Sequence, residues 1–401
     1  MPADRLAWID DEFETLESLD LRRSLRLRSG VQGPTVTIDN QQVVNFGSND
    51  YLGLAADARI AAAVRDALDG DRYGSGASPL IVGRSDLHDA LERELARFEQ
   101  TEAALVFPSG FAANVGAITA LASRGDIIFS DAKNHASIVD GCRLSGARVQ
   151  VYPHADVDYL NTMIGQAKQF RRRLIVTDTL FSMDGDFAPL VELVDLAQAN
   201  DCMLMVDEAH ATGVFGEGGR GVAELLGVED RIDIRVGTMS KALGCAGGFV
   251  AGSQALIDWL ANRARTYVFS TAPPDPWCAA ALAAVKIVEQ QPERRARLLT
   301  SANKLAQGLR EQGWQLGDNP ARSHLPQSQI IPVFLGEPAL TIQFADALLA
   351  QGIFVPGIRP PSVPEGESLL RISVSSAHTD EHFDCLMSAM GEIRSGFRST
   401  D

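Results

Sequence analysis

A lysine, an aspartate and a histidine stand at the ends of two apolar segments in the middle of the chain. Asp207 ends one such segment, and His210 follows it closely. A second segment leads through Gly237 and Thr238 into Lys241. A lysine amine can form a Schiff base with an aldehyde. A carboxylate at the nitrogen of a pyridine ring keeps that nitrogen protonated, so that the ring can act as an electron sink. This combination predicts pyridoxal 5'-phosphate (PLP) chemistry at the α-carbon of an amino acid.

Each of these residues also has an ordinary structural interpretation. Lys241 fits a surface turn rich in glycine, Asp207 fits the cap of a following helix, and His210 fits a solvated helix start. Their joint occurrence favours the chemical interpretation. The glycines around Lys241 then predict a loop rather than a helix. His210 is expected to reach the phenolic oxygen of the cofactor, and the hydroxyls of Thr238 and Ser240 are offered to its phosphate.

The segment Phe107–Asn114 follows a predicted strand and opens a predicted helix. The first N–H groups of a helix have no acceptor within the helix, and the helix dipole also favours a negative charge there. We therefore expect Gly110 and Phe111 to donate hydrogen bonds to the phosphate of the cofactor. A strand, turn and helix without any ligand stays as the alternative.

Two further polar residues follow predicted strands. His135 comes after the strand 126–130, where its ring can stack on the pyridine ring, although a histidine at a helix start is the ordinary alternative. Ser182 lies beyond the strand 174–178 and can form a hydrogen bond to the cofactor. Ligands in open α/β folds bind at the carboxyl edge of the sheet. Several strand ends that meet at one edge are therefore a stronger signal than any single residue.

Arg371 is a charged residue inside an otherwise apolar predicted strand, 369–374. A guanidinium that binds a substrate carboxylate through two hydrogen bonds would account for this position, and a structural ion pair is the alternative. The proline-rich segment 357–364 lies just before this strand and is expected to shape a substrate pocket.

The order of apolar segments predicts an α/β fold with a mostly parallel sheet between helices, followed by a smaller C-terminal α+β domain. Strands that are apolar throughout and alternate with helices indicate a parallel sheet that is covered on both faces. The expected strands of the large domain are 103–107, 126–130, 148–152, 174–178, 203–207, 234–237 and 248–251. The expected helices are 57–69, 86–100, 110–122, 136–144, 156–169 and 190–200.

The flanking regions have patterns of their own. Residues 4–24 predict an amphipathic helix, and two short strands are expected at 35–38 and 43–46. A helical stretch at 277–313, interrupted near Pro292, leads into the C-terminal part. That part is expected to contain strands at 328–335 and 369–374 and helices at 339–350 and 379–396. The expected division is an N-terminal segment 1–50, a large PLP-binding domain 51–285 and a small domain 286–401.

Composition restricts the partners and the cellular location. The formal net charge of −16 argues against nucleic-acid binding, because no basic stripe is present. The five cysteines are scattered without a Cys-x-x-Cys pair, which predicts neither a disulfide framework nor a metal site. The acidic N-terminus lacks an apolar secretory core, and no segment approaches the ~20 apolar residues that span a bilayer. We therefore expect a cytoplasmic protein without membrane association.

With these residues in place, the chain resembles the α-oxoamine synthases, fold-type I PLP-dependent transferases. These enzymes condense an amino acid with an acyl thioester and release carbon dioxide. The resemblance runs from the segment 45–54 to the segment 376–379. It implies that Lys241 carries the cofactor as a Schiff base, that Asp207 pairs with the pyridine nitrogen and that His135 stacks on the ring.

The resemblance also implies roles for other residues. The remaining expected cofactor contacts are Gly110, Phe111, Ser182, His210 and Thr238. The expected substrate contacts are Arg23, Asn49, Ser362 and Arg371. Among these, Arg371 matches the arginine that binds the carboxylate of the amino acid. Arg23 is similar to an N-terminal arginine involved in acyl-substrate binding, and Arg22 is an equally good match.

The reaction implied is the condensation of L-alanine with a pimeloyl thioester, which supplies biotin synthesis. Coenzyme A and an acyl carrier protein stay open as the carrier of the acyl group. The alternative is a sister reaction of threonine breakdown that uses glycine and acetyl-CoA, and a catalytically silent binding protein is a third interpretation. Family members are homodimers, which implies that residues near Ser270 and Thr271 complete the phosphate site of a second chain.

Three departures from the family pattern affect the substrate pocket. Ser362 stands where related synthases often have threonine, and Ala211 stands where glycine is common. The segment 77–80 also differs from the expected glycine and serine pattern. The specificity for the amino acid and the acyl chain is therefore less firmly predicted than the fold or the cofactor.

Overall fold

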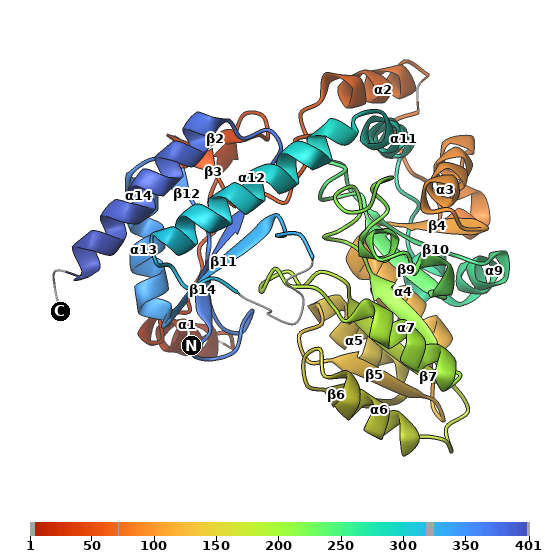
Figure 1. Ribbon diagram of the computed structural model, residues 1–401. Helices are drawn as coiled ribbons and strands as arrows, with labels where there is room; N and C mark the ends of the chain where they lie inside the picture. Colours follow the sequence, from red (N-terminus) through yellow and green to blue (C-terminus); the bar gives the residue numbers. More distant parts are fainter. Residues whose placement is uncertain (1–4, 71, 318–324, 399–401) are drawn as a thin grey trace. The chain divides into compact units, whose positions relative to one another are not determined.

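A computed structural model describes residues 5–70, 72–317 and 325–398 (Figure 1). The chain forms two compact units. The large unit comprises Asn49–Ser182 and Asp186–Arg297. The small unit comprises Met1–Ser48, Met183–Gly185 and Leu298–Asp401. The three-part division expected at residues 50 and 285 stays a prediction.

A seven-stranded sheet is the centre of the large unit. Its strands lie in the order β4-β10-β9-β8-β7-β5-β6. They are β4 (Ala103–Phe107), β5 (Ile127–Asp131), β6 (Arg148–Tyr152), β7 (Arg173–Asp178), β8 (Met203–Asp207), β9 (Ile234–Thr238) and β10 (Gly248–Gly252). Only β10 runs against the others, because it pairs antiparallel with both β4 and β9 while the other pairs are parallel. The mostly parallel sheet predicted from the sequence is confirmed.

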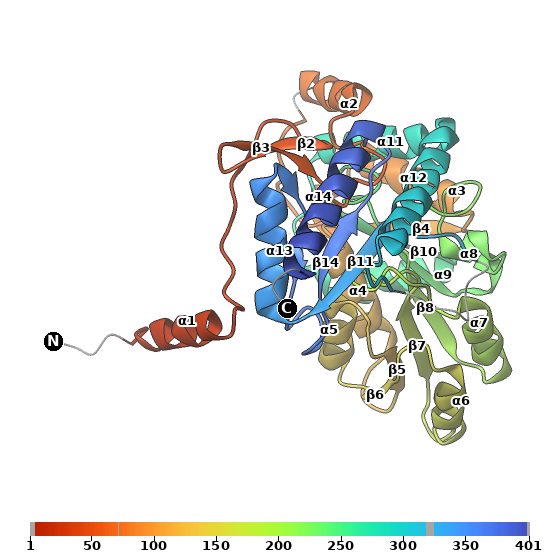
Figure 2. The ribbon, with the colours of Figure 1, turned by 60° about the vertical axis from the view of Figure 1, so that its left-hand side comes forward.

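Helices cover both faces of this sheet. The helices of the large unit are α2 (Ala58–Asp69), α3 (Asp86–Glu99), α4 (Gly110–Leu121), α5 (Ala136–Ser145), α6 (Val157–Gly165), α7 (Leu190–Ala199), α8 (Val222–Leu225), α9 (Gln254–Arg263), α10 (Arg265–Val268) and α11 (Asp275–Gln290), with a π-helical turn at Pro79–Gly83 and a 3-10 turn at Glu229–Arg231. In Figure 2, α4 and α5 lie on one side of the sheet and α6 and α7 on the other. Apolar side chains of α4, α5 and α9 form one continuous core with the sheet. Because helices lie on both sides, the strands are buried on both faces.

Several elements of the large unit were not predicted. The helices α8, α9 and α10 fall in segments that were left without an assignment. The reversed direction of β10 was not foreseen either, since no two-residue turn marks the connection from β9 to β10. The expected interruption near Pro292 is confirmed, because α11 ends at Gln290 and α12 (Pro292–Glu311) begins just after it.

The small unit contains two sheets. The first has the order β1-β2-β3-β12, formed by β1 (Arg28–Ser29), β2 (Thr35–Ile38), β3 (Gln41–Asn45) and β12 (Ile353–Phe354). The second has the order β11-β14-β13, formed by β11 (Ile330–Gly336), β13 (Gly357–Ile358) and β14 (Ser368–Ser373). Its helices, besides most of α12, are α1 (Trp8–Ser18), α13 (Pro338–Ala350) and α14 (Asp380–Arg398).

The N-terminal helix is shorter than predicted. Residue 4 of the expected helix 4–24 lies outside the described residues, and α1 ends at Ser18. Asp20 adopts a left-handed conformation with φ 56°, and the N–H of Leu21 donates to the carbonyl of Leu16 at 2.8 Å. A left-handed residue just past the last turn is a common way to end a helix. The polar pattern that continues to residue 24 therefore belongs to a segment without regular secondary structure.

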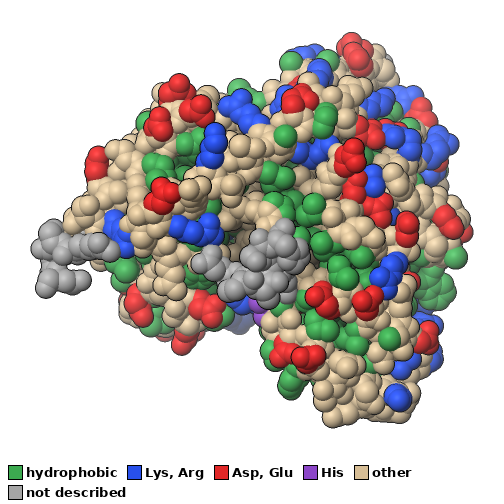
Figure 3. Space-filling model, in the orientation of Figure 1, with side chains coloured by type: hydrophobic (Ala, Val, Ile, Leu, Met, Phe, Trp, Pro, Cys, Tyr) green, Lys and Arg blue, Asp and Glu red, His purple; other side chains and the backbone are tan. Residues whose placement is uncertain are grey.

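The surface mixes charges of both signs. On the face drawn in Figure 3, acidic and basic side chains are interspersed among the coloured residues. Among the helices in the described ranges, none combines the length and the apolar character that crossing a membrane requires.

Candidate active site

The predicted cofactor residues lie at one edge of the large sheet. The strands β4, β5, β7, β8 and β9 share one direction, so their carboxyl ends meet at the same edge. The residues at or just beyond those ends are Gly110, Phe111, His135, Ser182, Asp207, His210, Thr238 and Lys241. The structure therefore brings the expected strand ends together, as the alternation of strands and helices predicted.

Asp207 is a buried carboxylate that accepts a hydrogen bond on each oxygen. Its Oδ2 accepts from Nδ2 of Asn114 at 2.6 Å, and its Oδ1 accepts from the N–H of Ala209 at 2.8 Å. The second contact is local and closes a turn, and the ordinary interpretation of this residue as the cap of a following helix is wrong, because residues 209–214 form turns and the next helix, α8, begins at Val222. The first is a contact across the fold. Both contacts fix the plane of the carboxylate, so Asp207 has a defined orientation.

Asn114 is a site residue that sequence reasoning did not single out. It lies one turn after Gly110 on α4, so the two residues share a helix face. Its amide also donates to Oγ of Ser137 at 2.9 Å. The spacing of Asn114 from the helix start was a signal that could have identified it.

His135 follows the end of β5 and contacts the end of the neighbouring strand β7. Its N–H donates to Oδ2 of Asp178 at 2.7 Å, and its ring Nδ1 lies 2.7 Å from Oγ of Ser137. The side chain is exposed, yet the pKa of the imidazole is lowered, first by desolvation and then by the positive charge of Lys241. The negative charge of Asp207 acts in the opposite direction. These couplings bring the lysine, the histidine and the aspartate into one electrostatic environment, in which the imidazole is neutral at neutral pH.

Asp178 is a second carboxyl that sequence reasoning did not identify. It lies directly opposite Asp207 in the register of β7 and β8, and it is buried. Burial raises its pKa well above the usual range, and the nearby charge of Asp207 adds to the effect. The Asp178 carboxyl therefore holds its proton to a higher pH than an exposed aspartate.

Lys241 belongs to a loop, as predicted, and the loop is closed by backbone hydrogen bonds. The N–H of Met239 donates to the carbonyl of Gly247 at 2.9 Å, which closes the base of the loop. Within it, the N–H of Gly244 donates to the carbonyl of Lys241 at 2.9 Å, and the N–H of Cys245 donates to that of Met239 at 2.8 Å. The lysine is therefore held by its backbone at several points.

The start of α4 and the end of β9 form a cradle of small residues. Oγ of Ser109 caps the helix by accepting from the N–H of Ala112 at 3.0 Å. A Cβ on Gly248 would lie 2.5 Å from the backbone of Gly110, and a Cβ on Gly110 would lie 3.4 Å from Oγ1 of Thr238. The approach at Gly248 requires glycine, whereas a Cβ on Gly110 would be in ordinary contact with Thr238. The first N–H groups of the helix, at Gly110 and Phe111, thus open beside the end of β9 and favour an anion.

The hydroxyl of Thr238 takes part in the loop itself. It donates to the carbonyl of Gly247 at 2.7 Å and lies 2.8 Å from Oγ of Ser240. Thr238 is buried, whereas Ser240 is exposed. Thr238 therefore braces the cradle, and the expected contact of its hydroxyl with a phosphate stays a prediction.

His210 is buried rather than solvated. Its Nδ1 lies 2.7 Å from Oη of Tyr51, which in turn donates to Oδ1 of Asn49 at 3.0 Å. The chain of contacts joins the segment after β8 to the predicted substrate residue Asn49. Tyr51 was part of the segment that resembles the family, but nothing in its spacing predicted a contact with His210.

A charged histidine anchors the region beyond Ser182. The ring of His154 bridges Oδ1 of Asp131 at 2.9 Å and Oδ2 of Asp186 at 3.0 Å. Burial acts to lower its pKa, but the hydrogen bonds that the ring donates to these two carboxylates prevail and raise the pKa of His154 to about 9. Asp186 is thereby fixed a few residues after the partly exposed Ser182.

The other predicted substrate residues belong to the small unit. Arg371 is buried in β14, with 5% of its surface exposed, and its Nη1 donates to Oγ of Ser373 at 2.7 Å. Arg23 donates from Nη2 to the carbonyls of Arg359 and Pro360, at 3.2 Å and 3.1 Å. Arg23 therefore contacts the predicted substrate loop.

Arg22 and Arg23, the two candidates for the arginine that contacts the acyl substrate, differ in their surroundings. Arg22 pairs with Glu17 and lies over the ring of Phe13. Ser362 is exposed, and its N–H donates to the carbonyl of Arg359 at 3.1 Å. Arg23 and Ser362 thus converge on the same residue of the loop, whereas Arg22 is engaged by α1.

The sequence matches the family model described as aminotransferase class I and II over residues 41–390. The chain belongs to this family. A relative named 8-amino-7-oxononanoate synthase, from Anaeromyxobacter dehalogenans, is 48% identical over 388 residues, which cover 97% of this chain and 96% of the relative. These matches confirm the resemblance to the α-oxoamine synthases.

Two solved structures resemble the chain over almost its full length. Serine palmitoyltransferase from Sphingomonas wittichii has a TM-score of 0.91 and 35% identity, with 97% of this chain and 98% of that chain covered. A serine palmitoyltransferase variant from S. paucimobilis, solved with a bound PLP–myriocin aldimine, has a TM-score of 0.91, 32% identity and the same coverage. The expected fold class, a fold-type I PLP-dependent transferase, is confirmed.

Proposed function

We propose that the chain is a cytoplasmic enzyme of biotin synthesis that condenses L-alanine with a pimeloyl thioester. The products are 8-amino-7-oxononanoate, carbon dioxide and a free thiol. The 48% identity to the relative of that name, over 97% of the chain, is the observation that carries this proposal. It favours this reaction over the condensation of glycine with acetyl-CoA.

The cofactor is PLP, and the residues at the sheet edge fit it. Asp207 is a buried carboxylate oriented by Asn114 and Ala209, which suits a cationic ring nitrogen. The absence of a side chain at Gly248 lets the backbone of β10 lie against the start of α4, and the first N–H groups of that helix favour a phosphate.

The remaining contacts of the cofactor follow from the same arrangement. Lys241 would hold it covalently. His135 would stack on the ring as a neutral imidazole, in keeping with its lowered pKa. Ser182, His210 and Thr238 would supply the polar contacts around it.

The protein groups would direct the reaction through binding and proton transfer. When bound, PLP takes up the electron pair released at the α-carbon of the amino acid. Arg371 would bind the carboxylate of L-alanine with its planar guanidinium, in buried surroundings where water competes little. Nζ of Lys241 would accept the α-proton and later return a proton to the same carbon. Asp207 would keep a proton on the ring nitrogen throughout.

Arg23, Asn49 and Ser362 would contact the acyl substrate. Arg23 and Ser362 both contact the backbone of Arg359, so the segment near residue 360 links them. Asn49 is held by Tyr51. Both coenzyme A and an acyl carrier protein are tested below as carriers of the pimeloyl group.

We also infer that the partner of the chain is a second copy of itself. Ile81, Val82 and Phe269 are 74%, 82% and 72% exposed, far more than is usual for large apolar side chains. The segments that carry them are neighbours, because the N–H of Ala272 donates to the carbonyl of Ala77 at 3.0 Å. A second copy that covers this surface would bring its own Ser270 and Thr271 near the phosphate site of the first.

The oligomeric state is expected to be a dimer at micromolar concentration. Sedimentation of the PLP-loaded protein should give the mass of two chains, because exposed apolar surface of this kind is usually covered by a partner. A stable monomer with full activity would contradict the proposal.

Thiol release by the purified, PLP-loaded protein tests the reaction directly. L-alanine with pimeloyl-CoA is expected to give turnover, and the same assay with a pimeloyl acyl carrier protein identifies the preferred carrier. Glycine with acetyl-CoA is expected to give little thiol. L-serine with palmitoyl-CoA is included because serine palmitoyltransferases are the structural relatives at 32–35% identity.

Each outcome assigns the function. Turnover with only glycine and acetyl-CoA, or with only L-serine and palmitoyl-CoA, would keep the cofactor and overturn the biotin assignment. Absence of thiol release with every pair, from protein that has bound PLP, would favour the silent binding protein instead.

A further inference from the structure

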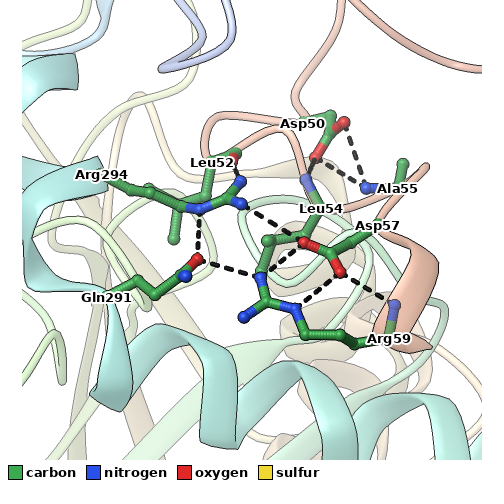
Figure 4. Close-up of polar contacts among 8 residues, drawn as sticks. All are labelled: Asp50, Leu52, Leu54, Ala55, Asp57, Arg59, Gln291 and Arg294. Carbon is green, nitrogen blue, oxygen red and sulfur yellow. Dashed lines mark hydrogen bonds and ion pairs between the residues drawn. The ribbon is translucent and has the colours of Figure 1, made fainter. Parts of the chain in front are cut away.

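The segment from Asp50 to Asp57 forms a compact turn with a polar support at each end (Figure 4). At one end, Oδ1 of Asp50 accepts from the N–H of Leu54 at 2.8 Å, and both carboxylate oxygens accept from the N–H of Ala55 at 3.2 Å. Asp50 is buried, and desolvation raises its pKa against the effect of these hydrogen bonds. The turn is thus folded around a carboxyl group. We call it the 50–57 turn.

Arg294, in the first turn of α12, supports the other end. Its Nη1 donates to the carbonyl of Leu52 at 2.8 Å, and its Nη2 lies 3.3 Å from Oδ2 of Asp57. Its Nε donates to Oε1 of Gln291 at 2.8 Å. Figure 4 shows the guanidinium reaching across to the turn from α12. Three separate donors hold Arg294 in one orientation, which a single ammonium group cannot do.

The loop of Lys241 rests directly on this turn. Gly244 has φ 64°, and a Cβ there would lie 2.3 Å from the backbone nitrogen of Ala55 and 2.5 Å from the carbonyl carbon of Leu54. The two backbones are therefore in contact without any side chain between them. A shift of the 50–57 turn would be transmitted to the carbonyl of Lys241, which accepts from the N–H of Gly244.

The segment of His210 rests on the same turn. A Cβ on Gly213 would lie 3.5 Å from Cδ1 of Leu52 and 2.9 Å from Cβ of Ala242. Tyr51, next to Leu52 in the turn, is fully buried and lies 2.7 Å from Nδ1 of His210. The residue whose carbonyl Arg294 holds is therefore the direct neighbour of the residue that contacts His210.

We propose that Arg294 is a positioning residue for Lys241 and His210, acting through the 50–57 turn. It fixes the carbonyl of Leu52, and the turn then fixes both loops of the candidate active site. The inference rests on the proposed function only in that Lys241 is the group whose position matters for the reaction.

Arg59 provides a matched control for the ion pair. It donates from Nε and Nη2 to the same Asp57 carboxylate, at 2.9 Å and 2.7 Å, and to Gln291 at 2.9 Å. The hydrogen bond from Arg59 is the main cause that lowers the pKa of Asp57 to about 2. Unlike Arg294, Arg59 donates no hydrogen bond to Leu52 in the described part of the chain. A change that matters only because it removes a charge near Asp57 would therefore affect both variants.

The test compares PLP-loaded Arg294→Ala and Arg59→Ala with the parent. Hydrogen exchange of the peptide 239–247, which contains the amides of Gly244 and Cys245, is expected to accelerate in Arg294→Ala and not in Arg59→Ala. The kcat for thiol release is expected to fall about tenfold to a hundredfold in Arg294→Ala, because small displacements of reacting groups have effects of this size. Its KM values should stay within about twofold. Arg59→Ala should keep a kcat within about twofold, since exposed ion pairs contribute little.

The exchange measurement separates failure of this inference from failure of the proposed function. If the parent releases no thiol, the proposed function fails, and the exchange comparison still decides the role of Arg294. Equal exchange at 239–247 in both variants, or exchange that rises uniformly over the chain, would overturn the positioning role. Arg294→Lys keeps the charge but loses the planar fork, so it should show an intermediate effect. It also keeps the comparison possible if Arg294→Ala does not fold.

Discussion

Replacement of Lys241 with alanine is expected to abolish thiol release, with a fall in kcat of about 10⁴-fold or more. The reason is that one amine serves two purposes in the proposed reaction, as the covalent attachment of PLP and as the acceptor of the α-proton. Proton transfer by a positioned side chain alone contributes about 10²–10⁴-fold. Borohydride reduction followed by peptide mass measurement checks the attachment independently of activity. The parent should retain the cofactor on the peptide that contains Lys241, and the variant should not.

Lys286→Ala is the control for this experiment. Lys286 is exposed on α11, and its charge acts on Glu94 of α3. This variant should show the rate and the labelled peptide of the parent. Retention of near-normal turnover by Lys241→Ala, or reduction that labels a different lysine of the parent, would contradict the assignment.

Asp207→Asn is expected to lower kcat by about 10²–10⁴-fold. The change removes the charge that would keep the ring nitrogen protonated, and removing one partner of a buried ion pair has an effect of about 3–5 kcal/mol. The substitution also leaves one of the two present hydrogen-bond donors without an acceptor. Both oxygens of Asp207 accept hydrogen bonds, from Asn114 and from Ala209, and an amide offers only one oxygen. The measurement is the steady-state rate of thiol release with saturating substrates.

Asp178→Asn tests whether the charge or only the shape of Asp178 matters in the pair that it forms with Asp207. Asp178 is the carboxyl whose pKa is raised by burial and by Asp207, so its neutral form is favoured to a higher pH than in an exposed aspartate. An amide reproduces that neutral form and can still accept from the N–H of His135. Asp178→Asn is therefore expected to lose less than about tenfold in kcat. Equal losses in the two variants would show that the two aspartates are not distinguished by charge.

The strands of the large sheet, and the polar residues that follow them, could be predicted from the sequence. A strand that is buried on both faces is apolar along its whole length, which is a strong pattern. Runs such as 203–207 contain almost no polar residue before the terminal aspartate, so both the strand and the position of Asp207 follow from the sequence. The direction of β10 did not follow. Its connection from β9 is a nine-residue loop whose glycines serve the packing around Lys241, and no turn residue marks it as a hairpin.

The partners of the site residues could not be predicted for a different reason. The contact of Asn114 with Asp207 joins residues far apart in the sequence, and so does the contact of Tyr51 with His210. Such pairs depend on which strands become neighbours, and that is set by the whole sheet rather than by local pattern. The roles assigned to the individual site residues stay predictions until the substitutions above are measured.

The antiparallel pairing of β9 with β10 has a consequence for the entropy of the site. A lysine on an open crossover would sample many backbone conformations, and cofactor binding would have to restrict them at an unfavourable entropy of roughly 1–2 kcal/mol per residue. Here the hydrogen bond from Met239 to Gly247 closes the loop within the sheet itself. The loop that carries Lys241 is therefore ordered when the protein folds. The entropy lost in ordering it does not reduce the affinity for the cofactor.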